Sequence, residues 1–251
     1  MSKYNSKIIE ENGVSRIEYF NEHWYKVPGH EELLPSTTHI INQVVSKGYG
    51  FEEWLKSVGH ESNYIVREAQ ESGSKLHHAI EQLIKGEQVV AEQPIIGGEK
   101  YDKNEWKKLN QWVDWMKQYK VEPLASEMIV YDERSAGTLD CIAKINGEIW
   151  VLDWKTGNDV HESAKFQVAD YFHKAQTGEF KPVKAGIVHI GASNRTFKEL
   201  NAPGVKLIEV DTKVYGEGFD NIYKLYKLLY PNEKAPTDVY PLELCLRKEV
   251  K

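Results

Sequence analysis

Two aspartates, Asp140 and Asp153, flank an Asn-Gly pair inside an alternating stretch, and Lys155 follows the second aspartate by two residues. Asn146-Gly147 between two β-rich runs is typical of a two-residue type I′ hairpin turn. Counting outward from this turn sets Asp140 opposite Asp153, with Cβ atoms about 4.5–5.5 Å apart on one face of the sheet. Lys155 shares that face, because side chains alternate along a strand.

Opposed carboxylates destabilise a hairpin unless a cation or a proton joins them. The opposite face is apolar and is the predicted core; it carries Leu139, Cys141, Ala143, Ile145, Trp150, Leu152 and Trp154. We therefore predict that the charged face binds a divalent metal. A cross-strand ion-pair cluster with Lys155 is the alternative interpretation of the same residues.

A long helix is predicted over residues 62–85, ending at Gly86 as the C′ residue. Its Gly73, His77 and Glu81 recur four residues apart and so share one face. Glycine inside a helix often marks a close approach. Neutral imidazole is a common metal ligand beside carboxylates, so His77 is a candidate ligand. The alternative is a surface histidine that hydrogen-bonds Glu81.

Three further residues could serve the aspartates. Gln167 and Tyr171 are four residues apart on a helix predicted over residues 162–176, and both side-chain types can hydrogen-bond phosphate oxygens. The alternative makes Gln167 solvated and Tyr171 half-buried. Glu127, on the strand before the hairpin, is either a third carboxylate or the partner of a surface lysine.

Ser36, Thr37 and Thr38 precede a short apolar helix, where hydroxyls and free amides could bind a phosphate. Plain N-capping explains the same residues. The tryptophans of a helix predicted over residues 102–120 could stack on bases. The helical spacing of Trp106 with its apolar neighbours favours a core position instead.

The whole chain is ordinary for a globular protein. Its 251 residues can bury a core as one domain or as a domain with a helical insertion. The net charge of −6 gives no overall nucleic-acid-binding signature, although a local basic groove would suffice. No apolar stretch predicts a membrane span and no targeting segment is evident at the start, so we expect a cytoplasmic protein.

Two cysteines, Cys141 and Cys245, are too few for a four-cysteine zinc or iron–sulfur site. Cys141 lies on the predicted core face, so we expect it to be a buried free thiol.

The order of predicted elements indicates an α/β fold, with a central mixed β-sheet flanked by helices and a helical N-terminal region. Strands are predicted over 14–20 and 23–27, a short helix over 51–58, strands over 124–131, 183–190 and 205–210, and a last helix within 211–230. The chain divides into residues 1–120, a hairpin and helical region contributing His77, and residues 121–251, within one compact unit.

Several of these segments resemble a known family. Gly137-Thr138-Leu139-Asp140 and Asp153-Trp154-Lys155-Thr156-Gly157 resemble the motifs of the PD-(D/E)xK nuclease superfamily. The spacings Gly73–His77–Glu81 and Gln167–Tyr171 resemble its RecB-like exonuclease branch, which includes phage and mitochondrial genome-maintenance exonucleases. Pro35-Ser36-Thr37-Thr38 is similar to a Ser/Thr-rich segment of those relatives. The resemblance covers roughly residues 35–175 and implies a restriction-endonuclease-like core for residues 121–251.

The resemblance implies a role for each matched residue. Mg²⁺ or Mn²⁺, with no iron–sulfur cluster, would be held by His77, Asp140, Asp153 and the backbone carbonyl of Trp154. Lys155 would orient or help deprotonate the attacking water. The nucleic-acid backbone would be contacted by Gln167 and Tyr171, and more weakly by Ser36, Thr37 and Thr38. Glu127 matches an acidic catalytic position less closely.

The expected function is a metal-dependent DNA exonuclease that acts on single-stranded ends in replication, recombination or repair, in a bacterial or phage-infected cell. The alternatives are a structure-specific endonuclease of the same fold, a non-catalytic DNA-binding recombination accessory protein, and a metal hydrolase for another phosphate ester.

Overall fold

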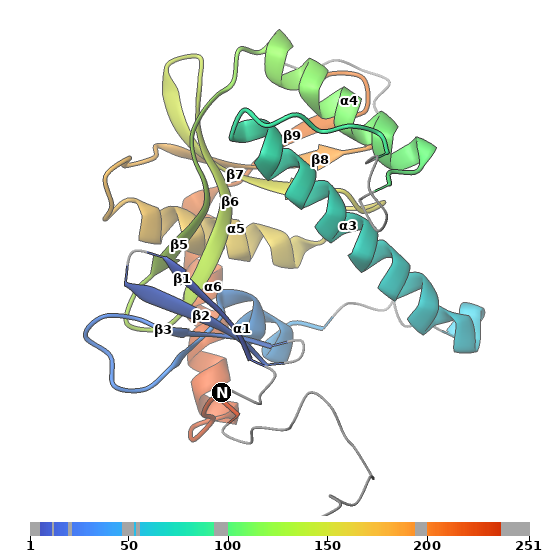
Figure 1. The fold of residues 1–251 in the computed structure, drawn as a ribbon. Helices are drawn as coiled ribbons and strands as arrows, with labels where there is room; N and C mark the ends of the chain where they lie inside the picture. Colours follow the sequence, from blue (N-terminus) through green and yellow to red (C-terminus); the bar gives the residue numbers. More distant parts are fainter. Residues whose placement is uncertain are drawn as a thin grey trace, which may run out of the picture.

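The computed structural model describes residues 6–11, 13–19, 22–46, 53, 56–92, 100–193 and 200–236. A five-stranded sheet lies at its centre, in the order β5-β6-β7-β8-β9 (Figure 1). Its strands are β5 (Glu122–Tyr131), β6 (Ala136–Ile145), β7 (Glu148–Lys155), β8 (Lys184–Ile190) and β9 (Val205–Glu209). All neighbours are antiparallel except β7 and β8, which are parallel. The predicted α/β class with a mixed central sheet is confirmed.

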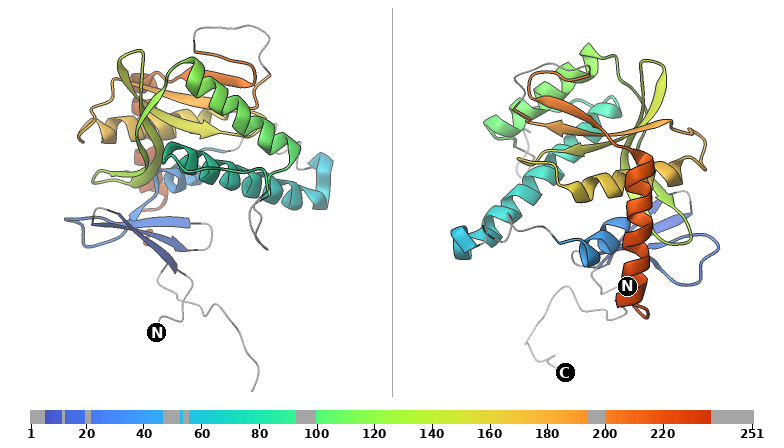
Figure 2. Two further views of the ribbon diagram at one scale, coloured as in Figure 1. Left: turned by 45° about the horizontal axis from the view of Figure 1, so that its top comes forward. Right: turned by 180° about the vertical axis from the view of Figure 1, so that it is seen from behind.

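Helices cover both faces of this sheet. The helices are α3 (Ser62–Ile84), α4 (Lys103–Gln118), α5 (Glu162–Ala175) and α6 (Thr212–Leu229). Helices α3 and α4 pack on one face and α5 on the other, with α6 against α5 (Figure 2). None of the described helices combines the length and apolarity needed to cross a membrane.

The first apolar cluster spans the predicted division of the chain. Leu76 of α3 and Trp115 of α4, both before residue 121, share it with Trp150 of β7 and Val188 of β8. Trp112 and Trp115 are buried there, and Trp106 packs against them, so the core interpretation of these tryptophans is confirmed. Residues 1–120 and 121–251 therefore contribute to one core.

The N-terminal region contains the predicted hairpin and helices, and its hairpin is part of a larger sheet. Its strands are β1 (Ser6–Glu11), β2 (Val14–Tyr19), β3 (Glu22–Lys26) and β4 (Leu34–Pro35), in a second, antiparallel sheet. The predicted hairpin is its β2–β3 pair. Side chains of this sheet pack on Ala136 at the start of β6, and α1 (Thr37–Val44) follows β4. Of the helix predicted over 51–58, residues 53 and 56–58 are helical and the others lie outside the described residues.

Local signals explain where the long helices begin and end. Asp102 and Glu105 form a capping box at the start of α4, since each side chain accepts a backbone N–H of the other at 2.7 and 2.8 Å. Helix α3 is followed, as predicted, by Gly86 with a φ of +79°. Such caps each contribute about 1 kcal/mol.

The β6–β7 hairpin has the predicted turn. Asn146 and Gly147 have φ values of 51° and 87°, and Ile145 pairs with Glu148. The predicted core face is also correct apart from Leu139, which packs in the cluster on the other side of the sheet. Ile142 and Val151 join it there, so helix α5 buries most of the face predicted to be charged.

Candidate metal centre

Three side chains from three elements converge beside the middle of strand β6. His77 of α3, Glu127 of β5 and Asp140 of β6 each offer a ligand atom, and these atoms lie within 4.8 Å of one another. His77 Nδ1 is 3.5 Å from Asp140 Oδ1. An octahedral Mg²⁺ with bonds of about 2.1 Å holds its ligands at most about 4.2 Å apart. The group therefore fits such an ion after small side-chain movements.

Strand register explains the position of Asp140. The β6–β7 pairing ends at Cys141 opposite Leu152, so Asp140 and Asp153 lie one residue beyond the paired part. There the backbone N–H of Trp154 donates to Asp140 Oδ2 at 2.7 Å. This bond fixes one carboxylate oxygen and turns the other toward His77.

Glu127 is held in an uncommon backbone conformation. On β5 it lies between Ser126, which pairs with Cys141, and Met128, which pairs with Leu139. Its φ of 52° is in the left-handed region, which costs a non-glycine residue on the order of 1–3 kcal/mol. The strained residue brings its carboxylate to His77 and Asp140, so Glu127 takes the third-carboxylate position and not the surface-lysine alternative.

Asp153 and Lys155 form a pair beside this group. Asp153 is 3% exposed, and Lys155 Nζ lies 2.7 Å from its Oδ2. The intervening Trp154 is buried in the core and anchors the strand end. The structure thus joins His77 and Asp140 as predicted, but Glu127, not Asp153, completes the group of ligand atoms. The role of the Trp154 carbonyl stays a prediction.

The acids in this site have perturbed pKa values. Burial and, after it, the charge of Asp140 together raise the pKa of Glu127 to about 7. Burial also raises the pKa of Asp153 to about 6, against the opposing effect of Lys155. Burial lowers the pKa of His77, but the carboxylate of Asp140 outweighs it and the pKa rises to about 9. In the absence of another cation, the site holds protons that a metal ion would replace.

A cavity of about 890 Å³ opens over this group, and its lining includes Gln167 and Tyr171, whose contact with a nucleic-acid backbone stays a prediction. Gln167 Nε2 donates to the Tyr171 hydroxyl at 3.2 Å. The Tyr171 ring lies over Gly137 of β6, where an added Cβ would come within 2.3 Å of it. Glycine in the Gly137-Thr138-Leu139-Asp140 segment therefore makes room for this tyrosine.

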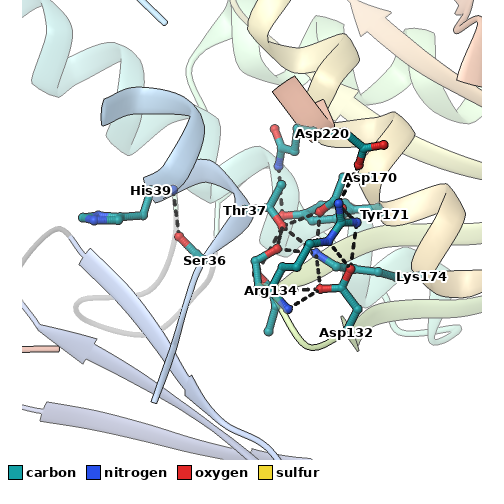
Figure 3. Close-up of polar contacts among 12 residues, drawn as sticks. Ser36, Thr37, His39, Asp132, Arg134, Asp170, Tyr171, Lys174 and Asp220 are labelled. Carbon is teal, nitrogen blue, oxygen red and sulfur yellow. Dashed lines mark hydrogen bonds and ion pairs between the residues drawn. The ribbon is translucent and has the colours of Figure 1, made fainter. Parts of the chain in front are cut away.

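The Ser/Thr segment divides between two roles. Ser36 and Thr38 line the cavity, and Ser36 Oγ also caps α1 by accepting the N–H of His39 at 3.0 Å. Thr37 is fully buried, and its hydroxyl donates to Asp170 at 2.6 Å (Figure 3). The prediction that Thr37 contacts nucleic acid is therefore not supported by its position, because its hydroxyl faces α5.

The partner of Thr37 belongs to a buried polar network that the sequence did not predict (Figure 3). Lys174 Nζ donates to Ser135 Oγ at 2.6 Å and to Thr37 Oγ1 at 3.0 Å, and forms an ion pair with Asp170. Arg134 lies 3.7 Å from the other oxygen of Asp170. The network joins the start of α1 to α5 and to the β5–β6 turn. The spacing of Asp170 and Lys174, four residues apart on a helix, is the one feature of the sequence that could have predicted their ion pair.

Helix α3 also carries Glu81 and Gly73, which the sequence placed on the same face as His77. Glu81 pairs with Lys85 and lies 3.8 Å from His78, so it is not the partner of His77. Gly73 does approach another segment, but a Cβ there would meet Thr156 Oγ1 at 3.5 Å, an ordinary contact.

Side chains from the N-terminal sheet and α1 also line the cavity and were missed: Arg16, Glu18, Glu22, His23, Tyr25, His39, Asn42 and Gln43. No motif marks them. Arg16 and Glu18 alternate along β2, which shows only that they share a face of that strand.

Comparison with models of known protein families gives no match, and no curated protein matches the chain. Among solved structures, one described as "Crystal structure of SSO0001" aligns with a TM-score of 0.34 and 15% sequence identity, covering 78% of this chain and 78% of that one. At this similarity it carries no argument about fold or function.

Proposed function

We propose that this protein is a metal-dependent DNA exonuclease that acts on single-stranded ends. The observation that carries the proposal is the convergence of His77, Glu127 and Asp140 within 4.8 Å, beside the Asp153–Lys155 pair. The resemblance of these segments to the RecB-like branch of the PD-(D/E)xK nucleases supports the same reading.

The donor set suits Mg²⁺ or Mn²⁺, since it combines carboxylate oxygens with one imidazole. His77, Asp140 and Glu127 would hold the ion. The resemblance implies that Asp153 and the Trp154 carbonyl would also take part. The bound ion would supply positive charge that acidifies a water molecule and offsets the charge developing on the phosphate.

Lys155 acts as a cation in this proposal. Burial lowers the pKa of its ammonium, but Asp153 and Asp140 outweigh that effect and the pKa lies above its ordinary value. A protonated Lys155, held by Asp153, orients the attacking water and stabilises charge on the phosphate oxygens. It is not the base that deprotonates the water.

The size of the cavity favours a single strand over a duplex. A volume of about 890 Å³ lies in the range that encloses one drug-sized ligand, which suits a short single-stranded segment better than a duplex. Gln167 and Tyr171 line this cavity and would hydrogen-bond the backbone of that segment.

The test is cleavage of labelled single-stranded DNA with Mn²⁺ by the wild type and by Asp140→Asn and Lys155→Ala. We expect each substitution to lower kcat by at least about 100-fold, the scale for loss of a group that stabilises transition-state charge. Asp114→Asn is the matched control, because Asp114 is exposed on α4 and its substitution removes the same charge. Equal activity in all four proteins would contradict the proposal, and binding of DNA without turnover would favour the accessory-protein alternative.

A further inference from the structure

The N-terminal sheet reaches the cavity through Arg16 of β2. Arg16 Nη1 donates to Thr138 Oγ1 at 3.3 Å, and the Tyr25 hydroxyl of β3 lies 3.3 Å from the same oxygen. Thr138 is two residues before Asp140 on β6. Two strands of this sheet therefore meet β6 directly beside the candidate metal centre, although the sequence resemblance begins only near residue 35.

The charge of Arg16 is unusual in its setting. Among the described residues that line the cavity, Arg16 is the sole lysine or arginine. The same lining carries five carboxylates: Glu18, Glu22, Glu81, Glu127 and Asp140. A polyanion entering this cavity would meet repulsion unless fixed positive charge faced it. Arginine supplies such charge at every relevant pH.

We infer that Arg16 binds the phosphate oxygens of a single-stranded nucleic-acid backbone next to the metal centre. This inference rests on the proposed function. Arg16 Nη2 contacts Glu18 at 2.7 Å, so Thr138 and Glu18 fix the guanidinium through one N–H of each terminal nitrogen. The guanidinium has five N–H donors in a planar fork that matches phosphate geometry. The side chain is 19% exposed, so it is held in place yet open to the cavity.

Because its guanidinium is already oriented, Arg16 should bind a phosphate more tightly than a free surface arginine would. A side chain already fixed loses less conformational entropy when it binds. The bonds to Thr138 and Glu18 use one N–H of each terminal nitrogen and leave the second N–H of each out of these two bonds. A phosphate can accept two parallel N–H···O bonds from such a pair.

The test measures binding, separately from catalysis. Lys155→Ala serves as the parent, because it keeps the residues of the metal group. Affinity for fluorescein-labelled oligothymidylate is measured by anisotropy with Mn²⁺ over a range of salt concentrations, for Arg16→Gln and Arg16→Lys in that parent. Arg67→Gln is the matched control, since Arg67 is exposed on α3 and pairs only with Glu71 in the described contacts.

Arg16→Gln is expected to weaken binding about 10- to 100-fold, the scale for a charge-assisted hydrogen bond. The slope of log affinity against log salt should become shallower by about 0.7, the value for one phosphate contact on a single strand. Arg16→Lys should keep the parent's slope while losing affinity, since lysine retains the charge and loses the fork. Arg67→Gln should match the parent.

Equal losses in Arg16→Gln and Arg16→Lys with an unchanged slope would assign Arg16 a structural role and overturn the inference. Affinities of both variants within about twofold of the parent would also overturn it, since one good contact is worth more than that. Failure of the parent itself to bind oligothymidylate would instead overturn the proposed function, and the inference with it.

Discussion

Asp140 is the residue on which the site depends. One oxygen accepts the backbone N–H of Trp154 at 2.7 Å, and the other lies 3.5 Å from His77 Nδ1. Glu127 reaches the same place only through a left-handed backbone conformation. Two acids and an imidazole this close require shared protons or a metal ion, because like charges that close cannot both ionise without compensation.

Asp140→Asn should lower the pKa of His77 in the metal-free protein. The Asp140 carboxylate is what raises that pKa to about 9, and burial alone lowers it. The imidazole pKa can be followed by NMR titration of the His77 ring protons. His78→Gln, which removes a neighbouring exposed imidazole, is the control and should leave the His77 pKa high. A His77 pKa that stays near 9 in Asp140→Asn would show that another group sets it.

Metal affinity should rise with pH. A metal ion must displace the protons on Glu127, whose pKa is about 7, and on His77, whose pKa is about 9. Below each pKa, every displaced proton weakens the apparent affinity about tenfold per pH unit. Calorimetric titration with Mn²⁺ at pH 6, 7.5 and 9 measures this directly. An affinity independent of pH would mean that the ion binds elsewhere.

Close contacts between the surrounding elements hold the residues of the site in position. Gly137 of β6 lies under the Tyr171 ring of α5, and Thr37 at the start of α1 is bound by Asp170 and Lys174 of the same helix. Residues on one side of α5 therefore do both: Gln167 and Tyr171 line the cavity, and Asp170 and Lys174 bind the start of α1.

Gly137→Ala should displace Tyr171, because the new Cβ would lie 2.3 Å from the ring. Overpacking of this kind costs typically about 1–3 kcal/mol in the free energy of unfolding, and cleavage activity should fall. Gly73→Ala in α3 is the matched control: its Cβ has an ordinary contact, and removing a helical glycine is expected to stabilise by up to about 1 kcal/mol. Chemical denaturation checks both. A Gly137→Ala protein as stable and active as the wild type would contradict the packing described.

Lys174→Met should destabilise the fold strongly. It would leave the carboxylate of Asp170, which is 1% exposed, without the closer of its two cationic partners, the other being Arg134 at 3.7 Å. Breaking a buried pair in this way costs about 3–5 kcal/mol. Lys165→Met on the same helix is the control, because its partner Glu162 is exposed and such pairs contribute about 0–1 kcal/mol. Similar unfolding free energies for the two variants would contradict the role given to the network.

At the scale of the whole molecule, the sequence predicted what depends on local signals. The Asn146-Gly147 turn and the helical periodicity of α3 fix the hairpin that carries Asp140 and the helix that carries His77. The sequence did not predict contacts between distant segments. Burial of the charged hairpin face by α5, the direction of Thr37 and the meeting of Arg16 with Thr138 each depend on packing that no local pattern records.

The same limit explains the third member of the site. The predicted register, which sets Asp153 opposite Asp140, is the one observed, but the pairing ends one residue before the two aspartates, at Cys141 and Leu152. The third ligand group comes instead from Glu127 on β5, the strand on the other side of β6, through an unusual φ value that propensity does not predict.

The most direct test of the central claim uses the wild-type protein with end-labelled single-stranded DNA, linear and circular, in Mn²⁺ and in EDTA. We predict stepwise shortening of the linear strand with Mn²⁺, little cleavage of the circle, and none of either in EDTA. Cleavage of the circle as fast as the linear strand would assign an endonuclease. Absence of cleavage of both substrates in Mn²⁺ would contradict the account.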